Sequence, residues 1–435
     1  MKEILLISYF FPPRGGIGVQ RAVKFCKYLP QFGFKPVVIT PQKPNGSFFI
    51  DEELAAEVPG DIEVRRSFSL EPYHIYRALG GRRKQDEADL RRGLSSSKKY
   101  LDPLKKLYFT LQAAFLVPDA KIGWYPWAVA DGARVIRERG IAAILSTSPE
   151  ATDHVIGRAL GRRFGIPLIL DFRDPWTMSH YSPRRPSWAR RRDENLELKC
   201  LKQAARVVCV QQKYIDDFKE KYPELLYEGY KYRVIRNGFD PDDFNDLTSI
   251  IKDGFNVVYT GSISYPRDPE PFFRAFANTR AESSDFAEEA RCTFIGEFDT
   301  RTLELVRSFG LDDVVEFLPY SGHRTALAHQ LGADALLLVS EGYITAKVYE
   351  YLGARRPIIC LTEGEELRQL VTETGSGVSF LPSEWFKMEE YMLRLFDESK
   401  RGKPVSGPVP DSLLPYTRRE QAKMLADLLA EVTGG

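Results

Sequence analysis

The chain has 435 residues, of which 43% are hydrophobic, and a formal net charge of +1 at pH 7. This length suffices for two or three hydrophobic cores, and the composition is typical of globular proteins. No apolar run approaches the roughly 18 residues of a membrane-spanning helix, and MKEILLIS has too short an apolar core for a signal peptide. Five scattered cysteines without CxxC spacing favour a reduced, cytoplasmic setting and argue against a zinc site.

The charge is unevenly distributed along the chain. Residues 1–243 contain 41 Lys and Arg against 30 Asp and Glu, whereas the remainder contains 20 against 30. A basic first half suits an anionic lipid surface or a phosphorylated acceptor. We therefore expect the two halves to have different partners.

The chain begins with a predicted strand, a Gly-rich loop and a helix. Residues 4–8 (ILLIS) form a buried-strand pattern, and apolar residues then recur at helical spacing from Val19 to Leu29. A dinucleotide-binding motif is excluded because the glycines come late and Arg21 stands where a third Gly belongs. The loop with Gly15, Gly16 and Gly18 still permits close approach of a ligand, and a plain flexible turn is the alternative.

The middle of the first half continues the strand–helix alternation. Residues 35–40 (KPVVIT) predict a second strand, and the charged, aperiodic residues 80–106 predict an exposed insertion. Residues 142–147 (AAILST) predict the next strand, followed by a helix that Ser146 or Ser148 would cap.

A further strand, residues 167–170 (PLIL), runs into DFRDPWT. Open α/β sheets bind ligands at the carboxyl ends of their strands, which makes Asp171, Arg173 and Asp174 site candidates. A structural Asp–Arg pair that closes the loop is the alternative. Residues 206–210 (RVVCV) and the segment YRVI predict two more strands.

A cluster of basic residues surrounds Trp188. Interleaved basic and aromatic residues favour a membrane-surface or acceptor patch, and no nucleic-acid-binding module accompanies them. We therefore expect no nucleic acid partner. The basic members are Arg184, Arg185, Arg190, Arg191 and Arg192. Further along, Asp240 and Asp242 have the spacing of a metal-binding pair, but their setting beside Pro241 favours turn and capping roles, so we predict no metal.

A second strand–helix series follows this turn. Its predicted strands are residues 256–259, 293–295, 314–318, 335–339 and 357–360. Two alternating series imply an α/β protein with two doubly wound domains, divided between residues 237 and 253.

The segment SEGYITAKVYEYLGARRPIIC carries the most specific chemistry. A helix that begins near Ala346 presents free backbone N–H groups and the positive end of its dipole, which together bind anions. Lys347 lies in the first turn, and Glu350 follows on the same face, where a carboxylate can accept hydrogen bonds from a ribose diol. An ordinary surface pair between Lys347 and Glu350 is the alternative.

Several segments together resemble a GT-B glycosyltransferase of the family 4-like group. The matching segments lie in the family's order along nearly the whole chain: YFFPPRGGIGVQR, PDAKIGWYPWA, STSPEATDHVIG, DFRDPW, RNGFD, YTGSI and AKVYEYLGARRPII. The resemblance implies two Rossmann-like domains facing across a cleft: an acceptor-binding domain at 1–243 and a donor-binding domain at 253–414. It also implies that a C-terminal helix at 415–435, with Met424, Leu425, Leu428 and Leu429 on its apolar face, crosses back to the first domain.

The resemblance also implies roles for individual residues. Glu350 matches the glutamate that binds the donor ribose, Gly16 matches the loop glycine near the diphosphate and acceptor, and Arg267 takes the place of a phosphate-binding lysine. The expected donor residues are Gly16, Gly261, Ser262, Arg267, Tyr320, Glu341, Ile344, Thr345, Ala346, Lys347 and Glu350. The expected acceptor side comprises Arg14, Gly15, Gly16, His154 and Asp171, with Arg173 and Asp174 orienting the sugar or acceptor. For His154, a place in the hydrophobic core is the stronger interpretation.

Two positions depart from the family pattern. Ser262 stands where many members have an arginine, so one positive charge is missing, and Lys347 would supply it. The two glutamates Glu341 and Glu350 have eight residues between them instead of the usual seven, which leaves the sugar contact of Glu341 open.

The function that the resemblance implies is retaining, metal-independent transfer of a sugar from a nucleotide-sugar donor, without a cofactor. The acceptor would be a glycan or lipid-linked acceptor in surface-polysaccharide or lipid-linked glycan assembly, and the protein would be cytoplasmic, with peripheral contact to the inner face of the membrane. Two alternatives remain: a catalytically silent sugar-nucleotide-binding protein and a sugar-nucleotide epimerase on the same fold.

Overall fold

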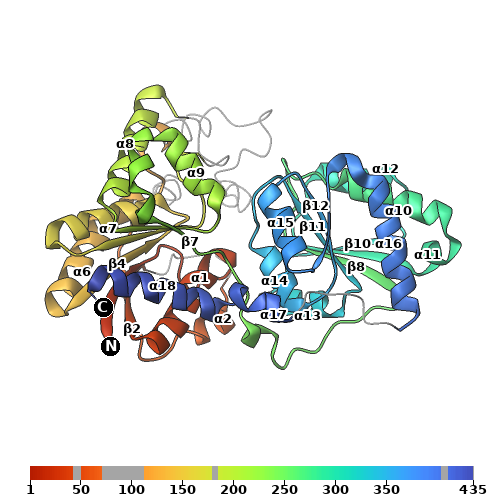
Figure 1. Ribbon diagram of the computed structural model, residues 1–435, viewed down its shortest axis with the longest axis horizontal. Helices are drawn as coiled ribbons and strands as arrows, with labels where there is room; N and C mark the ends of the chain where they lie inside the picture. The colour runs from red at the N-terminus through yellow and green to blue at the C-terminus, as the bar shows by residue number, and fades with distance from the viewer. Residues whose placement is uncertain (43–49, 71–111, 179–184, 403–409, 435) are drawn as a thin grey trace, which may run out of the picture. The chain divides into compact units, whose positions relative to one another are not determined.

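The computed structural model describes residues 1–42, 50–70, 112–178, 185–402 and 410–434 (Figure 1). The chain divides into two compact units, one made of Met1–Arg236 with Ala422–Gly435 and the other of Asn237–Gln421. The division falls just before residue 237, at the edge of the range expected from the sequence. The predicted charged insertion at 80–106 lies outside the described residues.

The first unit is a seven-stranded parallel sheet with strand order β3-β2-β1-β4-β5-β6-β7. Crossovers run outward in both directions from β1 and β4, so the unit is doubly wound, as predicted. Its elements are β1 (Lys2–Ile7), α1 (Ile17–Tyr28), η1 (Leu29–Phe32), β2 (Phe34–Pro41), α2 (Glu52–Ala56), β3 (Val64–Ser67), η2 (Ile122–Trp124), α6 (Tyr125–Glu138), β4 (Ile141–Thr147), α7 (Ala151–Phe164), β5 (Leu168–Phe172), α8 (Ser187–Gln203), β6 (Arg206–Cys209), α9 (Gln212–Lys221), η3 (Pro223–Lys231) and β7 (Tyr232–Val234).

Alternate residues of these strands face two helical layers. On one face, Ile4 and Leu6 of β1 pack with Val19 and Val23 of α1, which confirms the predicted apolar stripe of that helix. On the other face, α6 packs against β2, and α7 packs against β4 and β5. Because both faces are covered, the strands read as continuous apolar runs, which is why the sequence reveals them.

The C-terminal helix α18 (Arg418–Thr433) closes the first unit. Leu425 and Leu429 are buried in the same cluster as the face of β1 that α1 covers. The two termini lie side by side (Figure 1), and Lys2 Nζ donates a hydrogen bond of 3.1 Å to the Thr433 carbonyl. The predicted return of this helix to the first unit is confirmed. Met424 was wrongly placed on its apolar face and is 39% exposed, because the buried stripe runs through Ala422 and Ala426 instead.

The second unit is a six-stranded parallel sheet with strand order β10-β9-β8-β11-β12-β13. It is also doubly wound, with crossovers that diverge from β8 and β11. Its elements are η4 (Pro241–Phe244), β8 (Phe255–Thr260), α10 (Glu270–Glu282), α11 (Ser284–Glu289), β9 (Ala290–Ile295), α12 (Thr300–Ser308), β10 (Val315–Leu318), α13 (His323–Gly332), β11 (Ala335–Ser340), α14 (Lys347–Ala354), β12 (Ile358–Thr362), α15 (Glu365–Glu373), β13 (Gly377–Phe380), η5 (Pro382–Glu384), α16 (Trp385–Lys400), α17 (Pro410–Leu413) and η6 (Leu414–Tyr416).

Strand alternation again divides the core of the second unit between two faces. Phe255, Val257 and Tyr259 of β8 point into an aromatic-rich cluster with α10 and α16. The intervening Val258 points into the cluster built with α14 and α15. The strand ends, where the chain leaves both layers, are therefore the places where polar side chains gather.

Every strand predicted from the sequence is present, whereas β3 and β13 were missed. The missed strands, VRRS and GVSF, lie at sheet edges and have mostly half-buried side chains, so they lack a continuous apolar run. The turn at Asp240 has its predicted capping role, because its carboxylate accepts a 3.1 Å hydrogen bond from the Asp242 backbone N–H.

Candidate functional site

Each unit gathers polar side chains at the point where its strand order reverses. In the first unit this point lies between β1 and β4, and in the second between β8 and β11. Loops that leave two neighbouring strands in opposite directions create the ligand-binding position of open α/β sheets. The predicted site residues follow strands at or beside these two points, except Tyr320, which follows the edge strand β10.

The loop after β1 holds Arg14, Gly15 and Gly16. Gly16 has φ +101° and precedes α1, with nothing within 4 Å of where a Cβ would stand. Glycine is therefore required there for its backbone conformation and not for space. Arg14 is buried and lies over the rings of Tyr9 and Phe10, at 5.0 and 5.5 Å from their centroids.

Asp171, at the end of β5, is enclosed in an ion pair. Arg21 Nη2 is 2.8 Å from Asp171 Oδ1 and Arg21 Nε is 3.0 Å from Oδ2, and both side chains are 1% exposed. Burial alone raises the pKa of the Asp171 carboxyl, but Arg21 and a 2.7 Å hydrogen bond from the Thr147 hydroxyl hold it below its ordinary value. Asp171 thus belongs to a structural Asp–Arg pair, which was the alternative interpretation of the sequence, and its partner is Arg21.

Arg173 and Asp174 continue the chain beyond this pair. The Ser148 hydroxyl accepts hydrogen bonds from both backbone amides, at 2.8 and 3.3 Å, and the Arg173 guanidinium donates to the Gly18 carbonyl. Arg173 is partly exposed and Asp174 is exposed, so both remain accessible at the strand ends.

The predicted capping of α7 by Ser146 or Ser148 is wrong. The N-cap position is Glu150, whose side chain makes no capping hydrogen bond, because Ser148 serves the Arg173 loop and Ser146 serves a histidine. Ser146 Oγ lies 2.8 Å from Nδ1 of His154, whose ring is fully buried 4.4 Å from that of Phe172. Burial lowers the pKa of His154 to about 3, so the ring is neutral. The histidine lies in the core, which was the stronger interpretation of the sequence.

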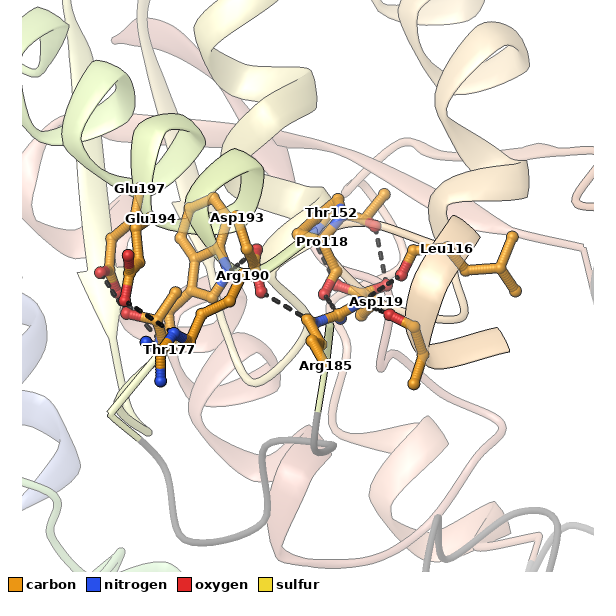
Figure 2. A network of polar contacts seen from close by, with 12 residues as sticks. Leu116, Pro118, Asp119, Thr152, Thr177, Arg185, Arg190, Asp193, Glu194 and Glu197 are labelled. Atoms are coloured by element: carbon orange, nitrogen blue, oxygen red, sulfur yellow. Dashed lines mark hydrogen bonds and ion pairs between the residues drawn. The ribbon is translucent and has the colours of Figure 1, made fainter. Parts of the chain in front are cut away.

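Helix α8 anchors the DFRDPWT segment from the side (Figure 2). Asp193 accepts a 2.9 Å hydrogen bond from the Trp176 indole, and Glu197, with no exposed surface, accepts 3.1 and 2.5 Å bonds from the amide and hydroxyl of Thr177. Sequence reasoning missed these two acids. Their spacing of four residues inside a polar helix was the available signal.

The basic patch around Trp188 needs a correction. Arg185 does not lie at the surface: its side chain is 5% exposed, lies 3.1 Å from Asp193 and donates to the backbone carbonyls of Leu116 and Pro118 (Figure 2). Arg190, Arg191 and Arg192 are exposed, as predicted for a surface patch, whereas Arg184 lies outside the described residues. Trp188 is half exposed, with its ring 5.8 Å from that of Phe115.

The second unit brings Gly261 and Lys347 together at its strand ends. Gly261 has φ +114°, and a Cβ there would overlap Cε and Nζ of Lys347. The neighbouring strand ends at Gly296, where a Cβ would overlap the Gly261 carbonyl. Gly296 is therefore required for space, because the opposing atoms are backbone atoms. Gly261 is required for its backbone conformation, and the space beside it is filled by the end of the lysine side chain.

Lys347 is buried, with 8% of its surface exposed. Nζ donates a 2.9 Å hydrogen bond to the Tyr259 hydroxyl and lies 4.6 Å from that ring's centroid. Burial, assisted by the positive charge of Arg267, lowers the pKa of Lys347 to about 7. The alternative of an ordinary surface pair with Glu350 is excluded because the lysine is buried.

The two predicted glutamates lie on either side of the start of α14: Glu341 in the loop before the helix and Glu350 inside it. Glu350 Oε1 lies 3.2 Å from Nε2 of His323, and Glu341 Oε1 lies 3.9 Å from Nε of Arg267. Helix α14 runs without a break from Lys347, so the additional residue between the two glutamates is accommodated in the loop, where Gly342 has φ +130°.

Five other predicted donor residues follow strands of the same sheet. Ile344 is a buried residue of the loop, and the carbonyls of Thr345 and Ala346 accept backbone hydrogen bonds from Val348 and Tyr349. Ser262 is exposed, and Tyr320 is 51% exposed after β10. The arrangement combines two cations, a helix N-terminus and a carboxylate, a set that suits a phosphorylated sugar or nucleotide.

Solved structures of other proteins have the same architecture. Anabaena HepE, solved in complex with UDP and glucose, is 14% identical, with a TM-score of 0.61 over 99% of this chain and 100% of that chain. The trehalose-6-phosphate phosphatase N-terminal domain of Candida albicans is 11% identical, with a TM-score of 0.64 over 99% of this chain and 97% of that chain. The lipopolysaccharide outer core galactosyltransferase WaaB is 11% identical, with a TM-score of 0.58 over 99% of each chain.

The comparison with curated proteins gave no match. The family model Glycosyltransferase Family 4 matches residues 15–243, which is more than half of the chain. The doubly wound units and the structural relatives identify the fold as GT-B. The chain therefore belongs to glycosyltransferase family 4 and is a glycosyl-transfer enzyme of the GT-B fold.

Proposed function

We propose that this enzyme transfers a sugar from a nucleotide-sugar donor, bound by the second unit, to an acceptor bound by the first unit, with retention of anomeric configuration. The observation that carries the proposal is the buried Lys347 at the reversal point of the second sheet, with Arg267 and the start of α14 nearby. HepE, which shares the fold, was solved with UDP and with UDP-glucose.

The donor is held by complementary groups. Lys347, Arg267 and the amides at the start of α14 bind the diphosphate, and Glu350 accepts hydrogen bonds from the ribose hydroxyls. Glu341, beside Arg267, orients that guanidinium or contacts the sugar. Tyr320, half exposed after β10, flanks the base.

The reaction breaks the bond between the anomeric carbon and the diphosphate oxygen, and the electron pair leaves with the phosphate. The acceptor oxygen bonds to the same face of that carbon, and its proton passes to the departing phosphate. Fixed cations stabilise the negative charge that develops, and loss of one such group costs about 3 kcal/mol in the transition state. The protein's own cations take this role, so we propose that no metal or cofactor is needed.

The first unit would hold the acceptor. Arg173 and Asp174 are accessible at the strand ends, and the Gly15–Gly16 loop lies at the reversal point of that sheet. Asp171 supports this loop system through Arg21 and does not itself reach the acceptor. The structural likeness to WaaB is consistent with an acceptor in surface-polysaccharide or lipid-linked glycan assembly.

The exposed arginines of α8 support peripheral contact with an anionic membrane. Arg190, Arg191 and Arg192 are exposed beside Trp188, while Asp193 and Glu197 of the same helix point inward. The outer face near the start of α8 is therefore cationic and aromatic, which suits lipid headgroups. None of the described helices is both long enough and apolar enough to cross a membrane.

A thermal-shift screen of UDP-, GDP-, ADP- and dTDP-sugars tests the donor site. A ligand at one hundred times its Kd stabilises the native state by about 2.7 kcal/mol. We expect one nucleotide class to raise the Tm of the native chain and to fail with Glu350→Ala. The control Glu288→Ala, at an exposed position of α11, should respond like the native chain. The proposal is wrong if no nucleotide sugar stabilises the native chain, or if Glu350→Ala is stabilised equally.

A further inference from the structure

Tyr259 is buried in the core, yet its hydroxyl reaches the strand ends. The residue stands near the end of β8, has no exposed surface and stacks on Phe294, with ring centroids 5.5 Å apart. Its hydroxyl donates a 3.0 Å hydrogen bond to the Ser262 carbonyl and accepts one of 2.9 Å from Lys347 Nζ. Burial raises the pKa of this phenol, so the hydroxyl stays protonated and can serve both partners.

The same hydroxyl links the two predicted diphosphate cations. Arg267 Nη1 donates a 3.1 Å hydrogen bond to the Ser262 carbonyl, the acceptor that Tyr259 also uses. The turn from Ser262 to Arg267 and the lysine of α14 come from segments far apart in the sequence. Tyr259 is thus the side chain that contacts both the turn and the lysine.

Lys347 keeps hydrogen-bonding capacity for a ligand. An ammonium group has three N–H donors, and within the described residues the Tyr259 hydroxyl is the hydrogen-bond acceptor that Nζ reaches. The remaining N–H groups can therefore bind the oxygens of a diphosphate. Their direction depends on the one bond that fixes the ammonium in place.

We propose that Tyr259 is a positioning residue for sugar transfer: its hydroxyl fixes Lys347 and the Ser262–Arg267 turn so that both cations meet the donor diphosphate. This inference rests on the proposed donor site. Tyr259 itself does not touch the substrate and acts through Lys347 and Arg267.

A positioning role has a signature that a purely structural role lacks. The Tyr259 hydroxyl accepts a bond from the charged form of Lys347, so its removal in Tyr259→Phe lowers the pKa of the lysine below its value of about 7. Arg267 acts in the opposite sense, because its charge disfavours the ammonium, and Arg267→Gln therefore raises that pKa. Glu350, on the same helix, favours the ammonium and is unchanged in both variants.

Titration calorimetry first identifies which of UDP, GDP, ADP and dTDP binds the native protein most tightly. The affinity for that diphosphate is then measured from pH 6 to 8.5. Since a pKa lower by about one unit leaves about tenfold less ammonium above pH 8, Tyr259→Phe should lose about tenfold in affinity at pH 8.5 and less than threefold at pH 6. The pH at which diphosphate affinity is half lost should be lower in Tyr259→Phe and higher in Arg267→Gln than in the native protein. The control Tyr391→Phe, which changes a buried tyrosine of α16, should keep the native dependence of affinity on pH.

The outcomes separate this inference from the proposed function. If none of the four diphosphates binds the native protein, the donor site itself is wrong. If one binds, and Tyr259→Phe lowers its affinity equally at every pH or not at all, the positioning role is overturned. The positioning role is also overturned if the pH dependence of affinity moves in the same direction in Tyr259→Phe and Arg267→Gln. Arg267 is partly exposed, so Arg267→Gln gives an answer even if Tyr259→Phe does not fold: an unchanged pH dependence of diphosphate affinity in Arg267→Gln means that the Lys347 ammonium does not govern binding, which overturns the positioning role.

Discussion

Gly261→Ala should separate a stability effect from a binding effect at one position. The glycine has φ +114°, which side-chain-bearing residues rarely adopt, and strain of this kind costs about 1–3 kcal/mol. The added Cβ also meets Cε and Nζ of Lys347. This clash adds little to the cost, since the end of a flexible side chain can move aside.

The displaced lysine should nevertheless weaken donor binding. A hydrogen bond to a charged group contributes about 1.5–3 kcal/mol, so nucleoside diphosphate affinity should fall by about tenfold to a hundredfold. The strain of about 1–3 kcal/mol should lower the Tm of Gly261→Ala by roughly 2–12 °C, because each kcal/mol lowers the Tm of a unit of this size by about 2–4 °C.

Gly310→Ala is the matched control, with φ +65° and nothing within 4 Å of the new Cβ. It should lower the Tm, as measured by calorimetric melting, and leave diphosphate affinity unchanged. Equal loss of affinity in the two variants, or native affinity in Gly261→Ala, would refute the reasoning.

Three further predictions concern the first unit. Asp171→Asn should lower the free energy of unfolding by about 3–5 kcal/mol in urea titrations, because it leaves the Arg21 charge buried without its partner; a loss below about 1 kcal/mol contradicts the enclosed pair. Burial raises the pKa of Asp193 to about 6, above its unfolded value of about 3.9, so the protonated carboxyl contributes stability at low pH that is lost as the pH rises through 6. The unfolding free energy of the native chain, relative to that of Asp193→Asn, should therefore be higher at pH 5 than at pH 7. An equal difference at the two pH values would exclude the raised pKa. Arg191→Glu should weaken co-sedimentation with phosphatidylglycerol vesicles by roughly tenfold at low salt, with Arg307→Glu of the second unit as the exposed control; equal retention in both variants argues against contact through α8.

The sheets were predictable because their strands are buried on both faces. Runs such as ILLIS and AAILST carry the signal in sequence, and the reversal of strand order then places Gly16, Arg173, Gly261 and Lys347 near the ligand-binding ends. The short edge strands β3 and β13 escaped because half-buried strands mix polar and apolar residues.

The pairing of buried charges was not predictable. Arg21 is noticeable in the sequence only as a residue in place of a glycine, and nothing local indicates that it reaches Asp171, 150 positions later. Ser148 has the residue type and position of a helix cap, but the amide of Arg173, just beyond the end of β5, competes for its hydroxyl. Such long-range choices depend on which loops the sheet brings together.

The same limit applies to Lys347. Its place in the first turn of a helix followed from the sequence. Its burial against Tyr259 depends on Gly261, which has a positive φ and directly follows the strand that carries Tyr259. The burial that lowers its pKa therefore follows from packing and not from the motif.

The most direct test of the donor site compares two ligands on one variant. Titration calorimetry would measure the affinity of Lys347→Met for the preferred nucleoside diphosphate and for the corresponding nucleoside, which lacks phosphates. A diphosphate clamp predicts at least about a tenfold loss for the diphosphate and no change for the nucleoside. An equal loss for both ligands, or native affinity for the diphosphate, would contradict the account.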